Sequence, residues 1–329
     1  MERQIDTDQL FHVLDEMAET LSNEGHGSYL ETLALAGDNL FQGSIMQQPL
    51  SDVAFKKMEE QFKKIDQMTM ERETVRKAFQ LAIIKGMKQA VQPHHAMTPD
   101  GIAIFMSYLL KRLLKDQLGV SVYDPAVGTG NMLTAMMNHT EGIERAIGAD
   151  VDESLIRLAF VMSNLQQYEL ELYNMDSVKE EGIPTVDVIV SDLPNGIYTN
   201  DEVVESFNTK PSEGRMPAEY AIIENSLRAL KPGGVMLLLI PNDMFTREHS
   251  EAFRTFMRKE TITLGMLQLP DTMFKAERHG KSIWMLQKQG QDVVAPQQAL
   301  FAELPSFTRA EAMTDMMAKI NEWFDHIYN

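Results

Sequence analysis

The stretch Asp124-Pro-Ala-Val-Gly-Thr-Gly-Asn-Met-Leu133 decides the fold that the sequence predicts. Residues 120–123 before it form a short β-type run, and residues 131–137 have the pattern of a helix. Gly128 and Gly130 permit backbone conformations that a Cβ would obstruct. Such a turn brings backbone amides and a helix N-terminus to the carboxyl edge of a sheet, where α/β folds bind nucleotide-like ligands.

The spacing of the two glycines separates this loop from the common phosphate-binding patterns. No Gly-Lys-Ser/Thr follows, as a P-loop would require, and the spacing departs from the dinucleotide pattern Gly-x-Gly-x-x-Gly. The pattern Asp-Pro-x-x-Gly-x-Gly instead resembles motif I of class I S-adenosylmethionine (SAM) methyltransferases, especially the amino (N6-adenine) methyltransferase core of type I restriction-modification M subunits. This resemblance implies SAM as the cofactor. A tight turn without a ligand is the alternative interpretation.

Composition excludes several classes of protein and chemistry. The chain has no cysteine, which excludes disulfides, thiolate zinc sites and methylation of a pyrimidine ring carbon through a covalent cysteine adduct. His94 and His95 have no matching ligand cluster, so no metal is expected. The formal net charge of -18 argues against nucleic acid as a partner, although nucleic acid and a partner protein both stay open.

Two domains are expected, an N-terminal all-helical domain at residues 1–95 and a methyltransferase domain at residues 96–329. Strands and helices alternate in the second domain, which predicts a doubly wound α/β fold. The resemblance implies a mostly parallel, seven-stranded Rossmann-like sheet. The start of the chain lacks the pattern of a signal peptide, and the apolar run 235–240 is too short to span a membrane. We therefore expect a cytoplasmic protein.

Several polar residues are expected at the carboxyl ends of the first strands. Thr98 is predicted as the N-cap of the helix at 102–114, and the resemblance implies that it also forms the wall for the methionine part of SAM. Asp150 ends the second strand and can accept both ribose hydroxyl hydrogens, with Asp152 as a competitor. The resemblance implies that Asp176 contacts the exocyclic amine of adenine, although it could merely cap a turn. The expected cofactor-binding residues are Thr98, Asp124, Pro125, Ala126, Gly128, Gly130, Asp150 and Asp176.

The apolar run 186–190 predicts a buried strand that ends in a candidate acceptor motif. Amino-methyltransferases carry Asn/Asp/Ser-Pro-Pro-aromatic there, in which the first side chain and a backbone carbonyl accept the amine hydrogens and the ring stacks on the base. The sequence departs from this pattern at two positions, and Tyr198 could supply the missing ring. The expected catalytic residues are Asp192, Leu193, Pro194 and Asn195.

The resemblance therefore implies SAM-dependent methyl transfer to an amine nitrogen, with an adenine-type acceptor in nucleic acid as the leading interpretation. Methylation of a small-molecule or protein amine is a second interpretation. A SAM-binding or interaction module with lapsed catalysis is a third. After residue 300 there is room only for a short strand and a helix, so the chain resembles a short, stand-alone bacterial relative without a target-recognition domain.

Overall fold

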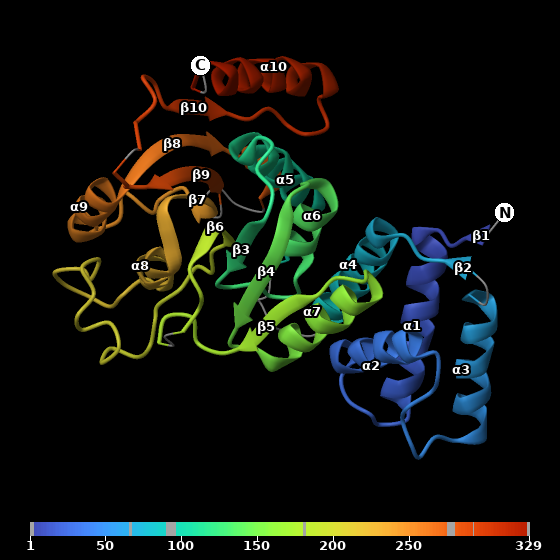
Figure 1. Ribbon diagram of the computed structural model, residues 1–329. Helices are drawn as coiled ribbons and strands as arrows, with labels where there is room; N and C mark the ends of the chain where they lie inside the picture. The colour runs from blue at the N-terminus through green and yellow to red at the C-terminus, as the bar shows by residue number, and fades with distance from the viewer. Residues whose placement is uncertain are drawn as a thin grey trace.

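The computed structural model describes residues 3–65, 68–89, 97–179, 182–274, 280–291 and 293–327, which form a helical bundle beside an α/β sheet (Figure 1). Its α-helices are α1 (Thr7–Asn23), α2 (Tyr29–Gln42), α3 (Asp52–Ile65), α4 (Arg72–Gln89), α5 (Asp100–Leu114), α6 (Asn131–His139), α7 (Glu153–Leu165), α8 (Ala218–Ala229), α9 (Glu251–Glu260) and α10 (Ala310–Ile327). Its strands are β1 (Arg3–Gln4), β2 (Met68–Thr69), β3 (Val120–Asp124), β4 (Ile143–Asp150), β5 (Leu170–Asn174), β6 (Val186–Asp192), β7 (Leu230–Pro241), β8 (Thr261–Gln268), β9 (Lys281–Lys288) and β10 (Leu300–Glu303).

The main sheet has the order β10-β8-β9-β7-β6-β3-β4-β5. Among the described strands of this sheet, β9 alone runs antiparallel to its neighbours. The expected α/β class is confirmed, and the sheet has eight strands, one more than expected, because β10 adds parallel to β8. The strand order reverses between β3 and β6, which creates the crevice at which open α/β sheets bind ligands.

The two faces of the sheet are covered by different helices. Adjacent residues of a strand point to opposite faces, so Val122 and Val188 pack with α5, α6 and α10, whereas Tyr123 and Ile189 pack with α8 and α9. All four of these side chains are buried. Their alternation fixes the register of β3 beside β6, and with it the positions of the residues that follow each strand.

The N-terminal bundle is joined to the sheet through α7. Leu158, Val161 and Met162 of α7 belong to the same buried cluster as the apolar residues of α1, α2 and α4, and Figure 1 shows these helices beside α7. The expectation of helices alone in this part needs one correction, since β1 and β2 form a short parallel pair. The expected domain boundary at 95/96 and both His94 and His95 lie outside the described residues.

Candidate active site

The loop between β3 and α6 has the backbone geometry that its glycines predict. Gly128 has φ of 53° and Gly130 has φ of 75°, so both lie in the left-handed region. A Cβ at Gly130 would approach the Ala159 Cβ to 3.1 Å, whereas a Cβ at Gly128 would meet no heavy atom within 4 Å. Gly130 therefore permits close packing against α7, and Gly128 presents bare backbone to open space.

A cavity lies against this loop and is partly open, with about 460 Å³ of empty space that includes solvent at its mouth. Its lining combines apolar side chains with a few polar groups, as is usual for small-molecule sites. Methionines make up much of its apolar wall. The cavity is lined by Met87, Met97, Thr98, Asp124, Ala126, Val127, Gly128, Thr129, Asn131, Met132, Leu155 and Asp192.

Asp124 is a buried acid at the end of β3. Its Oδ1 accepts hydrogen bonds from the Ala126 amide at 3.0 Å and from the Ser191 hydroxyl at 2.8 Å. Burial raises the pKa of Asp124 to about 7, and the negative charges of Asp150 and Asp192 add to this effect, although both hydrogen bonds oppose it. A bound cation would relieve this unfavourable environment.

Asp150 supports the glycine loop from the end of the neighbouring strand β4. Its Oδ2 accepts the Gly128 amide hydrogen at 2.9 Å, and its Oδ1 accepts that of Asp152 at 3.0 Å. The Asp152 carboxylate instead accepts from the amides of Ser154 and Leu155 as the N-cap of α7. Asp150 is thus the acid that faces the loop, whereas Asp152 caps a helix.

Asp176 follows β5 and is already engaged on both oxygens. Its Oδ1 accepts from the Val178 amide at 2.9 Å, and its Oδ2 accepts from the Tyr198 hydroxyl at 2.6 Å. Burial, and then the hydrogen bond and charge of Asp176, raise the pKa of Tyr198, so its hydroxyl stays protonated and donates. The ring that could replace the missing aromatic therefore contacts the expected adenine-binding acid.

Asp192, at the end of β6, is held by two donors. Thr98 donates its hydroxyl to Oδ2 at 2.7 Å, and the Lys281 ammonium pairs with Oδ1. The predicted N-cap role of Thr98 is wrong, because Pro99 is the N-cap of α5 and makes no side-chain cap. The threonine hydroxyl instead connects the segment before α5 to the candidate acceptor residue.

The cavity collects only part of the predicted site. Thr98, Asp124, Ala126, Gly128 and Asp192 line it, and Asp150 contacts it through the Gly128 amide. Pro125 and Gly130 are buried in the same loop. The remaining predicted residues lie outside the lining, with Leu193 buried, Asp176 half-buried, and Pro194 and Asn195 exposed.

Three contributors were missed by reasoning from the sequence: Ser191, Lys281 and Arg76. Lys281 is the first residue of β9, and its pairing with Pro241 at the carboxyl edge of the sheet follows from the antiparallel direction of β9, which no local pattern indicates. Ser191 precedes the acceptor motif and points to Asp124. Arg76 contacts Asn131 from a different part of the chain, so no local pattern indicates it.

Within residues 3–65, 68–89, 97–179, 182–274, 280–291 and 293–327, no group of three His, Cys, Asp or Glu side chains is arranged to hold a metal ion. Over the same ranges, no helix has the length and apolar character needed to cross a membrane.

Comparisons with known proteins identify the family. The sequence model of the N-6 DNA methylase family matches residues 93–326. The chain belongs to this family. A second sequence model, that of the YtxK N-terminal helical domain, matches residues 8–87.

Full-length relatives have the same organisation. The uncharacterised protein YtxK of Bacillus subtilis is 41% identical over 317 residues, which cover 96% of each chain. A crystal structure from Listeria monocytogenes, assigned to the class I SAM-dependent methyltransferases, is 37% identical, with a TM-score of 0.88 over 97% of this chain and 98% of that one. A type I restriction-modification methyltransferase subunit from Streptococcus thermophilus is 15% identical, with a TM-score of 0.65 over 98% and 76%, and shares the fold. The resemblance inferred from motif I is confirmed, and the chain is a methyltransferase by family.

Proposed function

We propose that the protein transfers the methyl group of SAM to an amine nitrogen, with adenine in nucleic acid as the acceptor. The observation that carries this proposal is that Asp124 and Asp192 line one cavity with the bare backbone of Gly128. SAM is cationic at its sulfonium and its amino group. A cavity lined by two acids, one of them buried, fits such a ligand better than it fits a phosphate.

The residues of the loop and of the neighbouring strand ends would hold the cofactor. Gly128 offers space for close approach of a ligand to the backbone. Asp150, fixed by the Gly128 amide, keeps lone pairs for the ribose hydroxyls, and Asp176 could accept from the adenine amine if Tyr198 yields or shares its oxygen. Thr98 would form part of the wall around the methionine moiety.

The acceptor would lie beside Asp192. When bound, SAM supplies an electrophilic methyl group on a positively charged sulfur. Asp192 and the carbonyl of Leu193 would accept the two amine hydrogens and direct the nitrogen lone pair, while Thr98 and Lys281 hold the carboxylate in one orientation. Pro194 and Asn195 continue the motif into the exposed loop, where the acceptor would enter. Positioning of this kind supplies much of the rate in an in-line displacement.

A small-molecule or protein amine is the second candidate acceptor. Asn195 is exposed where the family pattern has an aromatic ring, and stacking on such a ring is worth about 1–3 kcal/mol per base. The net charge of -18 also disfavours contact with a phosphate backbone. Both observations disfavour nucleic acid as the acceptor, and neither concerns the cofactor site.

The test combines cofactor binding with methyl transfer. Pure protein is titrated with SAM by calorimetry and is incubated with methyl-labelled SAM and either DNA, RNA or cell extract. We expect binding at one site and label in nucleic acid, lost in Asp192→Ala. Label in extract protein or metabolites alone would favour the second candidate. Binding without any labelled acceptor would favour a module with lapsed catalysis, and absence of binding would refute the proposal.

A further inference from the structure

We propose that the N-terminal bundle forms part of the cofactor site and that Arg76 is the positioning residue that connects the two. This inference rests on the proposed function, because it assigns SAM to the cavity. Arg76 belongs to α4 and is completely buried, which is costly for a charge unless every donor is satisfied. Its partners lie on both sides of the junction between the bundle and the sheet domain.

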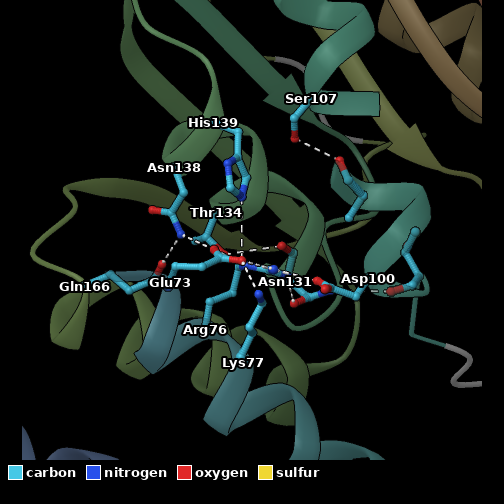
Figure 2. Close-up of polar contacts among 12 residues, drawn as sticks. Glu73, Arg76, Lys77, Asp100, Ser107, Asn131, Thr134, Asn138, His139 and Gln166 are labelled. Carbon is cyan, nitrogen blue, oxygen red and sulfur yellow. Dashed lines mark hydrogen bonds and ion pairs between the residues drawn. The ribbon is translucent and has the colours of Figure 1, made fainter. Parts of the chain in front are cut away.

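The guanidinium of Arg76 contacts three side chains, and Figure 2 shows it reaching from α4 toward them. On its own helix, Nε and Nη2 donate to the two carboxylate oxygens of Glu73, at 2.9 and 2.5 Å. Across the junction, Nη2 also donates to Asp100 at 2.5 Å and Nη1 donates to the Asn131 Oδ1 at 2.9 Å. The planar fork of an arginine satisfies this set, which a lysine could not.

The two partners across the junction are the first residues of α5 and α6. Asp100 begins α5, two positions after Thr98. Asn131 begins α6, directly after Gly130, and it lines the cavity itself. One arginine therefore contacts the starts of two helices, and one of these contacts is with a residue of the cavity wall.

The contacts continue from Asn131 to the candidate acceptor residue. The Asn131 Nδ2 donates to the backbone oxygen of Thr98 at 3.4 Å, and the Thr98 hydroxyl donates to Asp192 at 2.7 Å. Asp192 is in turn paired with Lys281. A displacement of Arg76 would be transmitted through Asn131 to Thr98, which lines the cavity and donates its hydroxyl to Asp192.

The electrostatics keep this cluster charged. Burial alone would raise the pKa of Glu73, but the hydrogen bonds and charge of Arg76 outweigh it and lower the pKa to about 2. Asn138 and His139, at the end of α6, also contact Glu73 (Figure 2). The ion pair therefore contacts both ends of α6, with Arg76 at its first residue and Glu73 at its last two.

Met87 is a second and independent link between the bundle and the cavity. It lies about three turns after Arg76 on the same helix and forms part of the cavity lining. The helix α4 thus supplies an apolar wall at one point and a polar anchor at another. A bundle that served only as an appended module would not need to reach the ligand space.

The test compares the SAM affinity of Arg76→Gln with that of variants that weaken the bundle elsewhere. Lys85→Met breaks the other ion-pair cluster of α4, in which Lys85 contacts Asp15 and Glu19 within the bundle. Leu14→Ala removes a completely buried side chain from α1. We expect at least a tenfold loss of affinity for Arg76→Gln, an intermediate loss for Arg76→Lys, and less than a threefold change in the two control variants at temperatures where all are folded.

A second variant keeps the test informative if Arg76→Gln does not fold. Asn131→Ala leaves the ion pairs of Arg76 with Glu73 and Asp100 intact and removes the contacts that Asn131 makes with Arg76 and Thr98, so it should lose affinity to a similar degree. Combining Arg76→Gln with Asn131→Ala should cost little more than either alone. If both single variants bind SAM as tightly as the wild-type protein, the role of Arg76 is refuted and the proposed function is not. If the wild-type protein does not bind SAM, the proposed function and this inference both fail.

Discussion

Replacing Gly128 by alanine isolates the role of the loop, because the new methyl group would meet no protein atom. Gly128 has φ of 53°, and no heavy atom lies within 4 Å of an added Cβ. Left-handed backbone costs an alanine about 1–2 kcal/mol. The lower entropy of the unfolded chain offsets about 0.4–1 kcal/mol of this. The net loss of about 1 kcal/mol corresponds to a fall in Tm of roughly 2–4 °C.

Gly43 provides a matched control for this strain. It has φ of 66° at the end of α2, and an added Cβ there would also meet nothing within 4 Å, but it does not line the cavity. Gly43→Ala should therefore lower Tm by a similar amount. The difference between the two variants should lie in SAM affinity, which Gly128→Ala alone should reduce at least tenfold, or about 1.4 kcal/mol.

Differential scanning fluorimetry for Tm and calorimetry for the SAM dissociation constant measure the two effects separately. Equal SAM affinity in Gly128→Ala and Gly43→Ala would refute the reasoning, because it would mean that the methyl group at Gly128 points to space that no ligand uses. A much larger fall in Tm for Gly128→Ala would also count against it. That result would assign the glycine to folding rather than to binding.

Three further predictions concern the acids. The pKa of Asp124 is raised to about 7, and a bound cation favours its ionised form. The SAM affinity measured by calorimetry should therefore fall as the pH decreases from 8 to 6. Asp124→Asn should bind SAM weakly, and its affinity should depend little on pH. The pKa of Glu73 is lowered from 4.5 to about 2 in the folded protein, which contributes about 1–3 kcal/mol to stability. This contribution is complete above pH 4.5 and is lost as the pH falls toward 2. In urea unfolding, the stability of Glu73→Gln should lack this dependence on pH. Asp150→Ala removes the acceptor of the Gly128 amide, a bond worth about 1.5–3 kcal/mol, and should weaken SAM binding ten- to hundredfold in the same titration.

Local sequence patterns were sufficient for the fold and for the loop. The apolar run of β6 and the two glycines after Asp124 depend on short-range rules, which the structure follows with Gly128 and Gly130 at positive φ. Asp150 accepts the Gly128 amide hydrogen and Asp152 caps α7, while the role of Asp150 toward the ribose stays a prediction. The eighth strand changed the strand count without changing the site, because β10 adds at the far edge of the sheet.

The remaining contacts join residues that are far apart in the sequence, so local rules could not predict them. Thr98 satisfies a helix-capping pattern, yet its hydroxyl donates to Asp192, 94 positions away. Lys281 pairs with Asp192 only because β9 runs antiparallel and starts at the ligand edge of the sheet. Arg76 resembles any basic residue on a charged helix, and its burial becomes evident only once α4 is packed against α6.

The position of the cofactor can be read from a crystal structure of the protein grown with SAM or its demethylated product. We expect density in the cavity beside Gly128, with the ribose hydroxyls on the Asp150 carboxylate and the sulfur between Asp124 and Asp192. A ligand bound elsewhere, or a cavity that stays empty at saturating ligand, would contradict this expectation.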